Sequence, residues 1–179
     1  MPLDLQPSPR AVFICAVLAP SLEIIDEALA RLTEKLGPVE DCSPPYDFDY
    51  TSYYESEMGA GLIKRLARFE RIVPMDDLCR IKRVTMAIEH ALAVDDTGEV
   101  RRQANIDPGL VSVEGLVLAT TKYSGHRICI APGLFAETTL LFTKQGECAP
   151  LQWTYPDYRR ADVQDFLLST RAIVLQQRP

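Results

Sequence analysis

The chain opens with an apolar run, AVFICAVLA at residues 11–19, in which no position is charged. Neighbouring residues of a strand point to opposite faces of a sheet, so a run that is apolar throughout predicts a central strand covered on both faces. After Pro20, apolar residues recur every three or four positions, which predicts an amphipathic helix. Ser21 stands at the expected N-cap and Gly37 at the expected end. The apolar stripe consists of Leu22, Ile25, Leu29, Leu32 and Leu36.

The next segments predict two strands and a second helix. CSPPY (42–46) is a loop, and the aromatic stretch 47–61, which ends in glycines, predicts a strand that runs into a turn. The spacing of LIKRLARFERIV (62–73) fits a strand and also a helix. We favour a strand paired with the preceding one, because MGAG is typical of a turn. Pro74 ends it, and Asp76 is the expected cap of a helix. That helix has a stripe made of Leu78, Ile81, Thr85, Ile88 and Leu92.

The second half of the chain predicts a hairpin and a final helix after several shorter elements. In order, these elements are a turn at 95–99, an alternating strand at 100–107, a DPG turn at 107–109, a short helix at 113–120 capped by Ser112, a hairpin of 126–131 with 135–142 around Pro132-Gly133, an irregular connection at 146–158 and a helix at 160–176.

This order of elements predicts an α+β fold. A βαββαβ order is that of the ferredoxin-like arrangement, which places the first strand inside the sheet. We therefore expect a single domain over 1–179, with a flexible N-terminus at 1–10. Its core is expected to be a mostly antiparallel ferredoxin-like sheet with the helices on one face. The C-terminal β-hairpin extends this sheet, and a final helix follows.

Composition narrows the class of protein. The chain has 179 residues, 47% of them hydrophobic and 25% charged, which excludes wholesale disorder. Its net charge of -6 argues against nucleic acid or an anionic membrane as a partner. The five cysteines are odd in number and form no C-x-x-C pair, which predicts reduced, mostly buried thiols rather than disulfides or a zinc ribbon. No secretion signal or membrane span is recognisable, so we expect a cytoplasmic protein.

Polar residues that could bind a ligand or take part in catalysis stand among the apolar ones between residues 100 and 142. If residues 131–134 form the hairpin loop, Ile128 lies opposite Glu137, and His126 becomes a diagonal neighbour of Glu137 on the same face. Arg127 then lies on the other face, and a shift of one residue would reverse this assignment. Glu137 could orient His126 as a general acid or base, with Asp107 as an orienting group or metal ligand. The identity of any metal or cofactor stays open.

Other residues complete the candidate site. Lys122 and Arg127 could hold an anionic group, and Asn105 lies beside Asp107 at the end of its strand. Tyr155 and Asp157 belong to an aromatic loop, WTYPDY, of the kind that carries function on a rigid scaffold. The same polar set could instead satisfy its own charges at a sheet edge. The tyrosines near residue 53 could stack on a base or pack in a strand, and His90 is expected on the solvated face of its helix.

Several motifs together resemble one family. They are YYESEMG, ARFERI, NIDPG, LATTK, SGHRICIAPGLFAETTLLF and WTYPDYR, between about residues 50 and 160. In this order they are similar to a bacterial domain-of-unknown-function family, number 4416, and the first strand and helix also fit. The resemblance brings no established reaction. Members are sometimes labelled GTP-binding, but the chain has no G-x-x-x-x-G-K-[ST] loop, so a P-loop GTPase is not expected.

Two hypotheses follow from the sequence. The first is a small-ligand site, for a phosphate- or carboxylate-bearing molecule, at the polar cluster on the 100–142 strands, with acid–base catalysis as an open question. The alternative is a non-catalytic interaction or assembly module that uses sheet edges, with a homo-oligomer among the open possibilities. Neither a G-x-S-x-G elbow nor an H-E-x-x-H or G-x-G-x-x-G motif is present.

Overall fold

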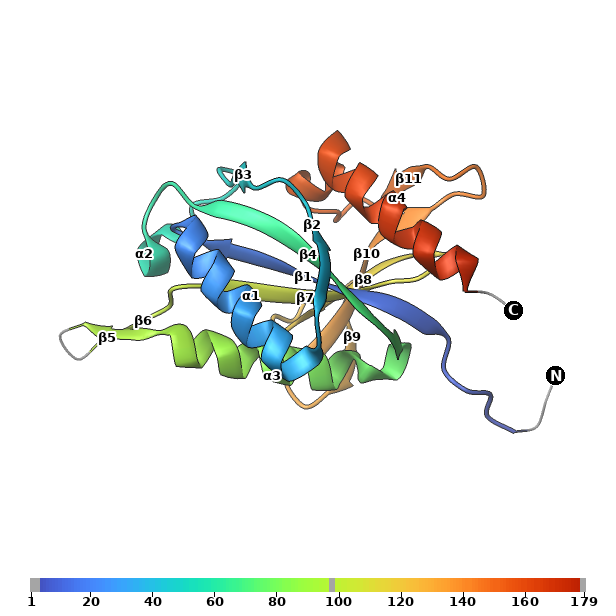
Figure 1. The fold of residues 1–179 in the computed structure, drawn as a ribbon, viewed down its shortest axis with the longest axis horizontal. Helices are drawn as coiled ribbons and strands as arrows, with labels where there is room; N and C mark the ends of the chain where they lie inside the picture. The colour runs from blue at the N-terminus through green and yellow to red at the C-terminus, as the bar shows by residue number, and fades with distance from the viewer. Residues whose placement is uncertain (1–3, 97–98, 178–179) are drawn as a thin grey trace.

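The computed structural model describes residues 4–96 and 99–177, which form an α+β protein with a nine-stranded sheet (Figure 1). The strands of this sheet are β1 (Arg10–Ala19), β2 (Val39–Cys42), β3 (Tyr46–Asp47), β4 (Ile63–Pro74), β7 (Asn105–Val111), β8 (Gly115–Thr120), β9 (Ile128–Ala131), β10 (Leu134–Phe142) and β11 (Cys148–Pro150). The helices are α1 (Leu22–Leu36), α2 (Glu55–Met58), α3 (Leu78–Leu92) and α4 (Ala161–Gln176). Short 3₁₀ turns are η1 (Met75–Asp77) and η2 (Pro156–Arg159).

The sheet has the order β11-β10-β8-β7-β1-β4-β2, with β3 paired to β4 and β9 paired to β10. Every strand pair in the described ranges is antiparallel. β1 lies between β4 and β7, with Cys15 opposite Ala67 on one side and Pro108 on the other. The prediction that the first apolar run forms an interior strand is therefore confirmed.

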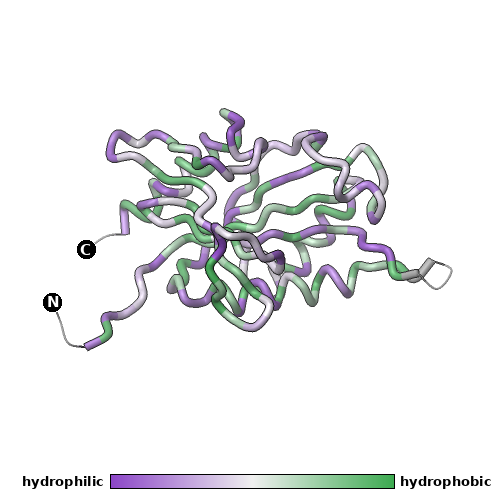
Figure 2. The backbone as a smooth tube through the Cα atoms, turned by 180° about the vertical axis from the view of Figure 1, so that it is seen from behind, coloured by the Kyte–Doolittle hydropathy of each residue, from purple (hydrophilic) through white to green (hydrophobic). Residues whose placement is uncertain are grey.

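Both faces of β1 are buried, and each face has its own helices. Phe13 and its odd-numbered neighbours pack with α1 and α3, and Phe13 stacks on Phe69 with 4.2 Å between ring centroids. Ile14 and Ala16 pack on the opposite face with residues of α4 and η2. The expectation that all helices lie on one face is wrong, because a strand apolar on both faces must be covered on both. Figure 2 shows apolar segments crossing the middle of the molecule.

The long periodic segments were predicted well. α1 begins after Ser21 and ends before Gly37, which takes a positive φ of 108°. The stripe of α3 is buried at all the expected positions, although its N-cap is Asp77 rather than Asp76. β4, the β9–β10 hairpin and α4 are also present at the expected places.

Three local predictions are wrong, and the strand expected at 100–107 is interrupted, because residues 102–104 belong to no strand. Residues 47–61 contain only the end of β3 and the short helix α2, so they form no extended strand. The expected turn at 107–109 lies inside β7, where Gly109 pairs with Leu118 of β8. The expected helix at 113–120 is β8.

Ser112 caps a turn between β7 and β8 instead of a helix. Its hydroxyl accepts hydrogen bonds from the backbone N–H groups of Glu114 and Gly115, at 3.1 and 3.2 Å. A serine hydroxyl can satisfy a tight turn as well as a helix start, so the sequence signal was ambiguous. Gly115 also lies close to β10, since a Cβ there would be 2.5 Å from the Leu140 carbonyl oxygen.

A small second hairpin follows α3. β5 (Val94–Asp96) pairs with β6 (Glu99–Arg101), with Asp96 opposite Glu99. The turn expected at 95–99 overlaps both strands of this hairpin, and its residues 97–98 lie outside the described residues, as do residues 1–3 of the expected flexible N-terminus.

The cysteines and the helices bear on two further expectations. All five cysteines are free thiols, as expected, but only Cys15 is buried and Cys129 is exposed, so the prediction of mostly buried thiols is wrong. In the part of the chain that is described, no helix combines the length and apolar character needed to cross a membrane.

Candidate functional site

A cavity of about 660 Å³ lies at the end of the sheet where β1 ends and β4 and β7 begin. Its walls come from the loop at 48–54, the second half of α3, the start of β7, the loop after β8 and the loop at 155–157. These segments are distant in sequence and meet only in the folded chain. A volume of this size suits a small organic ligand.

Six of the eight predicted site residues line this cavity. They are Asn105, Asp107, Lys122, Arg127, Tyr155 and Asp157. His126 and Glu137 do not line it, but Glu137 accepts a hydrogen bond from Arg127 and contacts His126. The structure therefore places the predicted residues in one neighbourhood and separates them into a cavity wall and its support.

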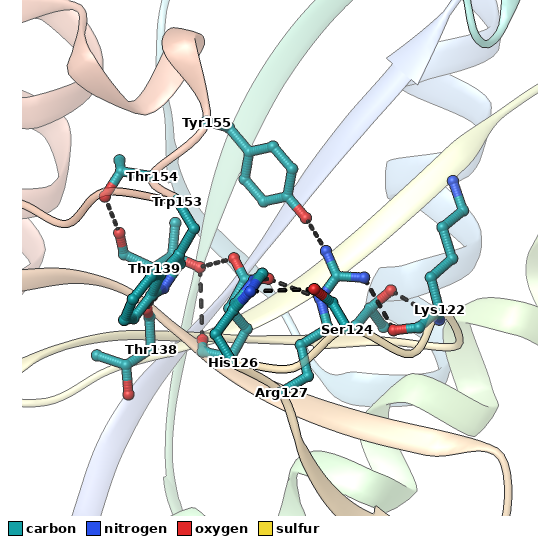
Figure 3. A network of polar contacts seen from close by, with 11 residues as sticks. Lys122, Ser124, His126, Arg127, Thr138, Thr139, Trp153, Thr154 and Tyr155 are labelled. Carbon is teal, nitrogen blue, oxygen red and sulfur yellow. Dashed lines mark hydrogen bonds and ion pairs between the residues drawn. The ribbon is translucent and has the colours of Figure 1, made fainter.

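His126 and Glu137 form the predicted contact. His126 Nε2 and Glu137 Oε2 are joined by a hydrogen bond of 2.9 Å, and His126 Nδ1 is joined to the Ser124 hydroxyl at 3.1 Å. The imidazole stacks on Trp153, with 4.9 Å between ring centroids (Figure 3). Glu137 is only 2% exposed, so the neighbours that donate to it must replace the water that burial removes.

The hairpin register that led to this contact was wrong. Ile128 lies opposite Ala136 rather than Glu137, and the register of β9 against β10 shifts next to the loop. His126 precedes β9 and belongs to a turn closed by a bond from the Arg127 N–H to the Ser124 carbonyl. That turn returns the imidazole to Glu137 and brings Arg127 to the same carboxylate, although the two were expected on opposite faces.

Arg127 connects three parts of the site. Its Nε donates to Glu137 Oε2 at 2.7 Å, its Nη1 to the Lys122 carbonyl at 2.8 Å and its Nη2 to the Tyr155 hydroxyl at 2.7 Å. Burial alone would lower the pKa of this guanidinium, but the bond to Glu137 and the contacts with Tyr155 outweigh it and raise the pKa. Arg127 therefore stays charged and fixes the loop after β8 against the loop at 155–157.

Tyr155 stays protonated at this junction. Burial, with a further contribution from the Glu137 carboxylate, raises the pKa of Tyr155 to about 12, although Arg127 partly opposes the shift. Its hydroxyl accepts the bond from Arg127 and keeps its own proton available for donation.

A chain of polar contacts crosses the wall formed by β7. Arg102 Nη1 donates to Asn105 Oδ1 at 3.0 Å, and Asn105 Nδ2 donates to Asp107 Oδ2 at 2.7 Å. Lys82, which is buried on α3, donates to the Ile106 carbonyl at 3.0 Å and lies 3.5 Å from Asp107 Oδ1. Asn105 thus orients Asp107, and the buried lysine balances part of its charge.

Asp157 is committed to a buried ion pair. Its Oδ2 lies 2.5 Å from Lys64 Nζ, and the Tyr46 hydroxyl donates to the same oxygen at 3.1 Å. Both charged side chains are nearly inaccessible, at 8% and 2% exposed. Because Asp157 already balances the charge of Lys64, only the remaining hydrogen-bonding capacity of its carboxylate can serve a ligand.

Lys122 differs from the other cations of the cavity. Its Nζ lies 3.6 Å from the centroid of the Tyr53 ring and 5.3 Å from that of Tyr54. Among the residues that the structure describes, no carboxylate pairs with it. The cavity lining contains five lysines and arginines against three acids, although the whole chain carries a net charge of -6. The positive excess is therefore local to this site.

Several lining residues were not predicted. Lys82 and Glu89 on α3 were missed, as was Arg102. Lys64 was considered only as part of a basic strand that could receive phosphate or pair with nearby glutamates, and it lines the cavity. Lys82 and Glu89 are seven residues apart and flank the apolar stripe, so their spacing placed them at its border without showing that a cavity lies there. His90 is exposed, as expected, but it also lines the cavity.

A metal centre built on His126, Glu137 and Asp107 was left open by the sequence. Within residues 4–96 and 99–177, no group of three or more His, Cys, Asp or Glu side chains is arranged to hold a metal ion. Asp107 interacts instead with Asn105 and Lys82.

Comparison with known proteins gives a match to one family model. The model is described as a domain of unknown function, DUF4416, and it matches residues 9–173. The match runs from just before β1 into the last turn of α4, so it includes every segment that lines the cavity. No curated protein matches the chain.

Proposed function

The chain belongs to the DUF4416 family, a domain of unknown function, and we propose from the cavity that it binds a small organic molecule carrying a phosphate or carboxylate group. The observation that carries this proposal is Lys122, a cation on the cavity wall that has no carboxylate partner among the described residues. A lysine that is not neutralised within the protein can bind an external anion. The surplus of positive charge in the lining supports the same conclusion.

The aromatic part of the lining supports an organic body on this ligand. Phe48, Tyr50, Tyr53, Tyr54 and Tyr155 contribute to the walls. Rings of this kind offer large apolar area and polar edges, which suits a planar or cyclic molecule. Burial raises the pKa of Tyr54, so its hydroxyl remains a neutral hydrogen-bonding group.

An acid–base role for His126, with Glu137 as partner and Asp107 as orienting group, remains the catalytic extension of the proposal. The 2.9 Å bond between His126 and Glu137 supports it. Arg127, however, lines the cavity and binds the same carboxylate, whereas neither His126 nor Glu137 lines the cavity. We therefore assign the pair a positioning role first: it holds Arg127, which in turn holds the backbone of Lys122 and the hydroxyl of Tyr155.

The test is a binding measurement on a lysine variant with a matched control. Lys122→Met removes the proposed anion contact, whereas Lys144→Met removes an exposed lysine on the turn between β10 and β11. The probes are phenyl phosphate and benzoate, with benzyl alcohol as the neutral match. A charge-assisted hydrogen bond is worth about 1.5–3 kcal/mol, so Lys122→Met should weaken anion binding by roughly 10- to 100-fold.

Thermal shift provides the first screen. A probe present at ~100 times its Kd adds about 2.7 kcal/mol to stability, which raises Tm by roughly 5–10 °C in a chain of this length. If the anions give no shift, or if both lysine variants weaken them equally, the proposal fails.

An interaction or assembly module is the second candidate, and one observation favours it. Tyr123, before β9, and Ile128, its first residue, are 77% and 71% exposed, and within the described residues β9 pairs with β10 alone. The aromatic loop gives less support, since the Trp153 indole donates to the Thr138 carbonyl and stacks on His126. Light scattering that finds a monomer at micromolar to millimolar concentration would remove self-assembly.

We also propose that the core is ferredoxin-like. The order β7-β1-β4-β2, with α1 between β1 and β2 and α3 between β4 and β7, supports this description. An experimental structure in which two of these neighbours run parallel would contradict it.

A further inference from the structure

Glu89 presents an incompletely bonded carboxyl group to the cavity. It reaches the cavity from α3, and its Oε1 accepts the Ile106 N–H at 2.6 Å. No other hydrogen bond to Glu89 occurs within the described ranges. A carboxylate can accept about four hydrogen bonds, so this group has unused capacity on the cavity side.

The cations near Glu89 are bound elsewhere. Lys82, on the same helix, donates to the Ile106 carbonyl and lies near Asp107. Arg102 donates to Asn105 and pairs with Glu57 at 3.4 Å. Glu89 and Asp107 thus place two acids in the lining beside the single buried lysine of α3.

Burial and charge both act on this carboxyl group. Burial raises the pKa of Glu89, Lys82 and Arg102 oppose the shift, and Asp107 adds to it. A carboxyl group in this state gains more from an added cationic donor than a fully solvated one does, because its own solvation is already reduced.

The cavity therefore has two chemically different walls. The loop after β8 carries Lys122, which lacks a carboxylate partner in the described part of the chain, and α3 carries Glu89, which lacks a donor side chain there. One molecule that offers an anionic group to Lys122 and a cationic donor to Glu89 would give both side chains the partner they lack. A molecule with only the anion would fill the cavity and leave Glu89 with the Ile106 N–H as its one donor and no water, which is unfavourable for a carboxyl group with unused acceptor capacity.

We propose that Glu89 determines the specificity of the site, and that the ligand is a zwitterion whose anionic group binds Lys122 and whose protonated amine binds Glu89. The chemical class is an amino carboxylate or an amino phosphate. This proposal rests on the anion-binding function argued above and narrows its ligand class.

The experiment compares matched probes by titration calorimetry at pH 7. One pair is 4-(aminomethyl)benzoate and 4-methylbenzoate, and a second, flexible pair is 6-aminohexanoate and hexanoate. In the wild type, the amine-bearing member of at least one pair should bind about 10-fold or more tightly than its match. In Glu89→Gln this ratio should fall close to one, whereas the exposed-site control Glu147→Gln should keep it.

The outcomes separate this proposal from the one it rests on. If the matched acids bind as well as their amine-bearing partners and Lys122→Met still weakens both, anion binding holds and the zwitterion proposal fails. If Lys122→Met changes nothing, the anion-binding function itself fails. Should Glu89→Gln not fold, Glu89→Asp shortens the reach but keeps the charge. Glu89→Asp should then lower the affinity ratio of 4-(aminomethyl)benzoate to 4-methylbenzoate, the shorter and rigid pair. An unchanged ratio would overturn the role of Glu89.

Discussion

Replacing Glu137 by glutamine keeps the size of the side chain but removes the charge on which Arg127 and His126 depend. The Glu137 side chain is 2% exposed and that of Arg127 is 10% exposed, with 2.7 Å between the bonded atoms. Removing one partner of a buried ion pair costs about 3–5 kcal/mol. Arg127 keeps its acceptors on Lys122 and Tyr155, so we place the loss of unfolding free energy near the lower limit, about 3 kcal/mol. Tm should then fall by roughly 6–12 °C.

A double-mutant cycle measures this interaction directly. Unfolding by urea, followed by circular dichroism at pH 7, would be measured for wild type, Glu137→Gln, Arg127→Met and the double variant. Because the double variant buries neither charge, it should be less destabilised than the sum of the single variants by about 1 kcal/mol or more. Additivity within ~0.5 kcal/mol would refute the reasoning. The exposed control Glu147→Gln should stay within about 0.5 kcal/mol of wild type.

Three other predictions address different parts of the molecule. Asp157→Asn leaves the buried Lys64 without a counter-charge, so urea unfolding should show a loss of about 3 kcal/mol, and a loss below ~1 kcal/mol would contradict the pair. Gly115→Ala should lower Tm more than Gly109→Ala. A Cβ at residue 115 would lie 2.5 Å from a backbone oxygen of β10, whereas a Cβ at residue 109 would lie 2.6 Å from a leucine methyl group that can move. Equal losses in Tm would count against this packing. Burial raises the pKa of Glu89, so at neutral pH the folded state carries a penalty for the charged form that Glu89→Gln lacks. Glu89→Gln should be more stable than wild type at pH 7. Its advantage should shrink as pH falls through the raised folded pKa and vanish below about 4, where Glu89 is protonated in both the folded and the unfolded wild type. A stability difference that does not depend on pH would exclude this explanation.

The parts of the fold that could be predicted are those set by periodic burial. The run at 11–19 predicted a strand with two covered faces, and the stripe of α3 predicted a helix with one covered side; both are present. The local errors arose where residues typical of turns occur inside the sheet. Pro108 and Gly109 suggested a turn but lie in β7, where neighbouring strands on both sides determine the conformation.

The candidate site also contains residues that could be predicted from the sequence and residues that could not. Asn105, Asp107, Lys122 and Arg127 could be found because polar residues are conspicuous at the ends of apolar strands. Glu89 could not be assigned to the site, since helical periodicity shows that it borders the buried stripe but not what faces it. Only the packing of α3 against β7 brings its carboxyl group to the cavity.

The position of β1 in the middle of the sheet has a consequence for the protein during its synthesis. β1 is made before the other strands of this sheet, yet its pairing with β7 joins Val12 to Val111, ninety-nine residues later. At a translation rate of about 5–20 residues per second, one edge of this apolar strand waits on the order of 5–20 s for its partner. Pairings so distant in sequence also slow folding, because a long loop must close before they form. During that interval the nascent chain exposes its most apolar segment, where a chaperone would bind and where aggregation would begin.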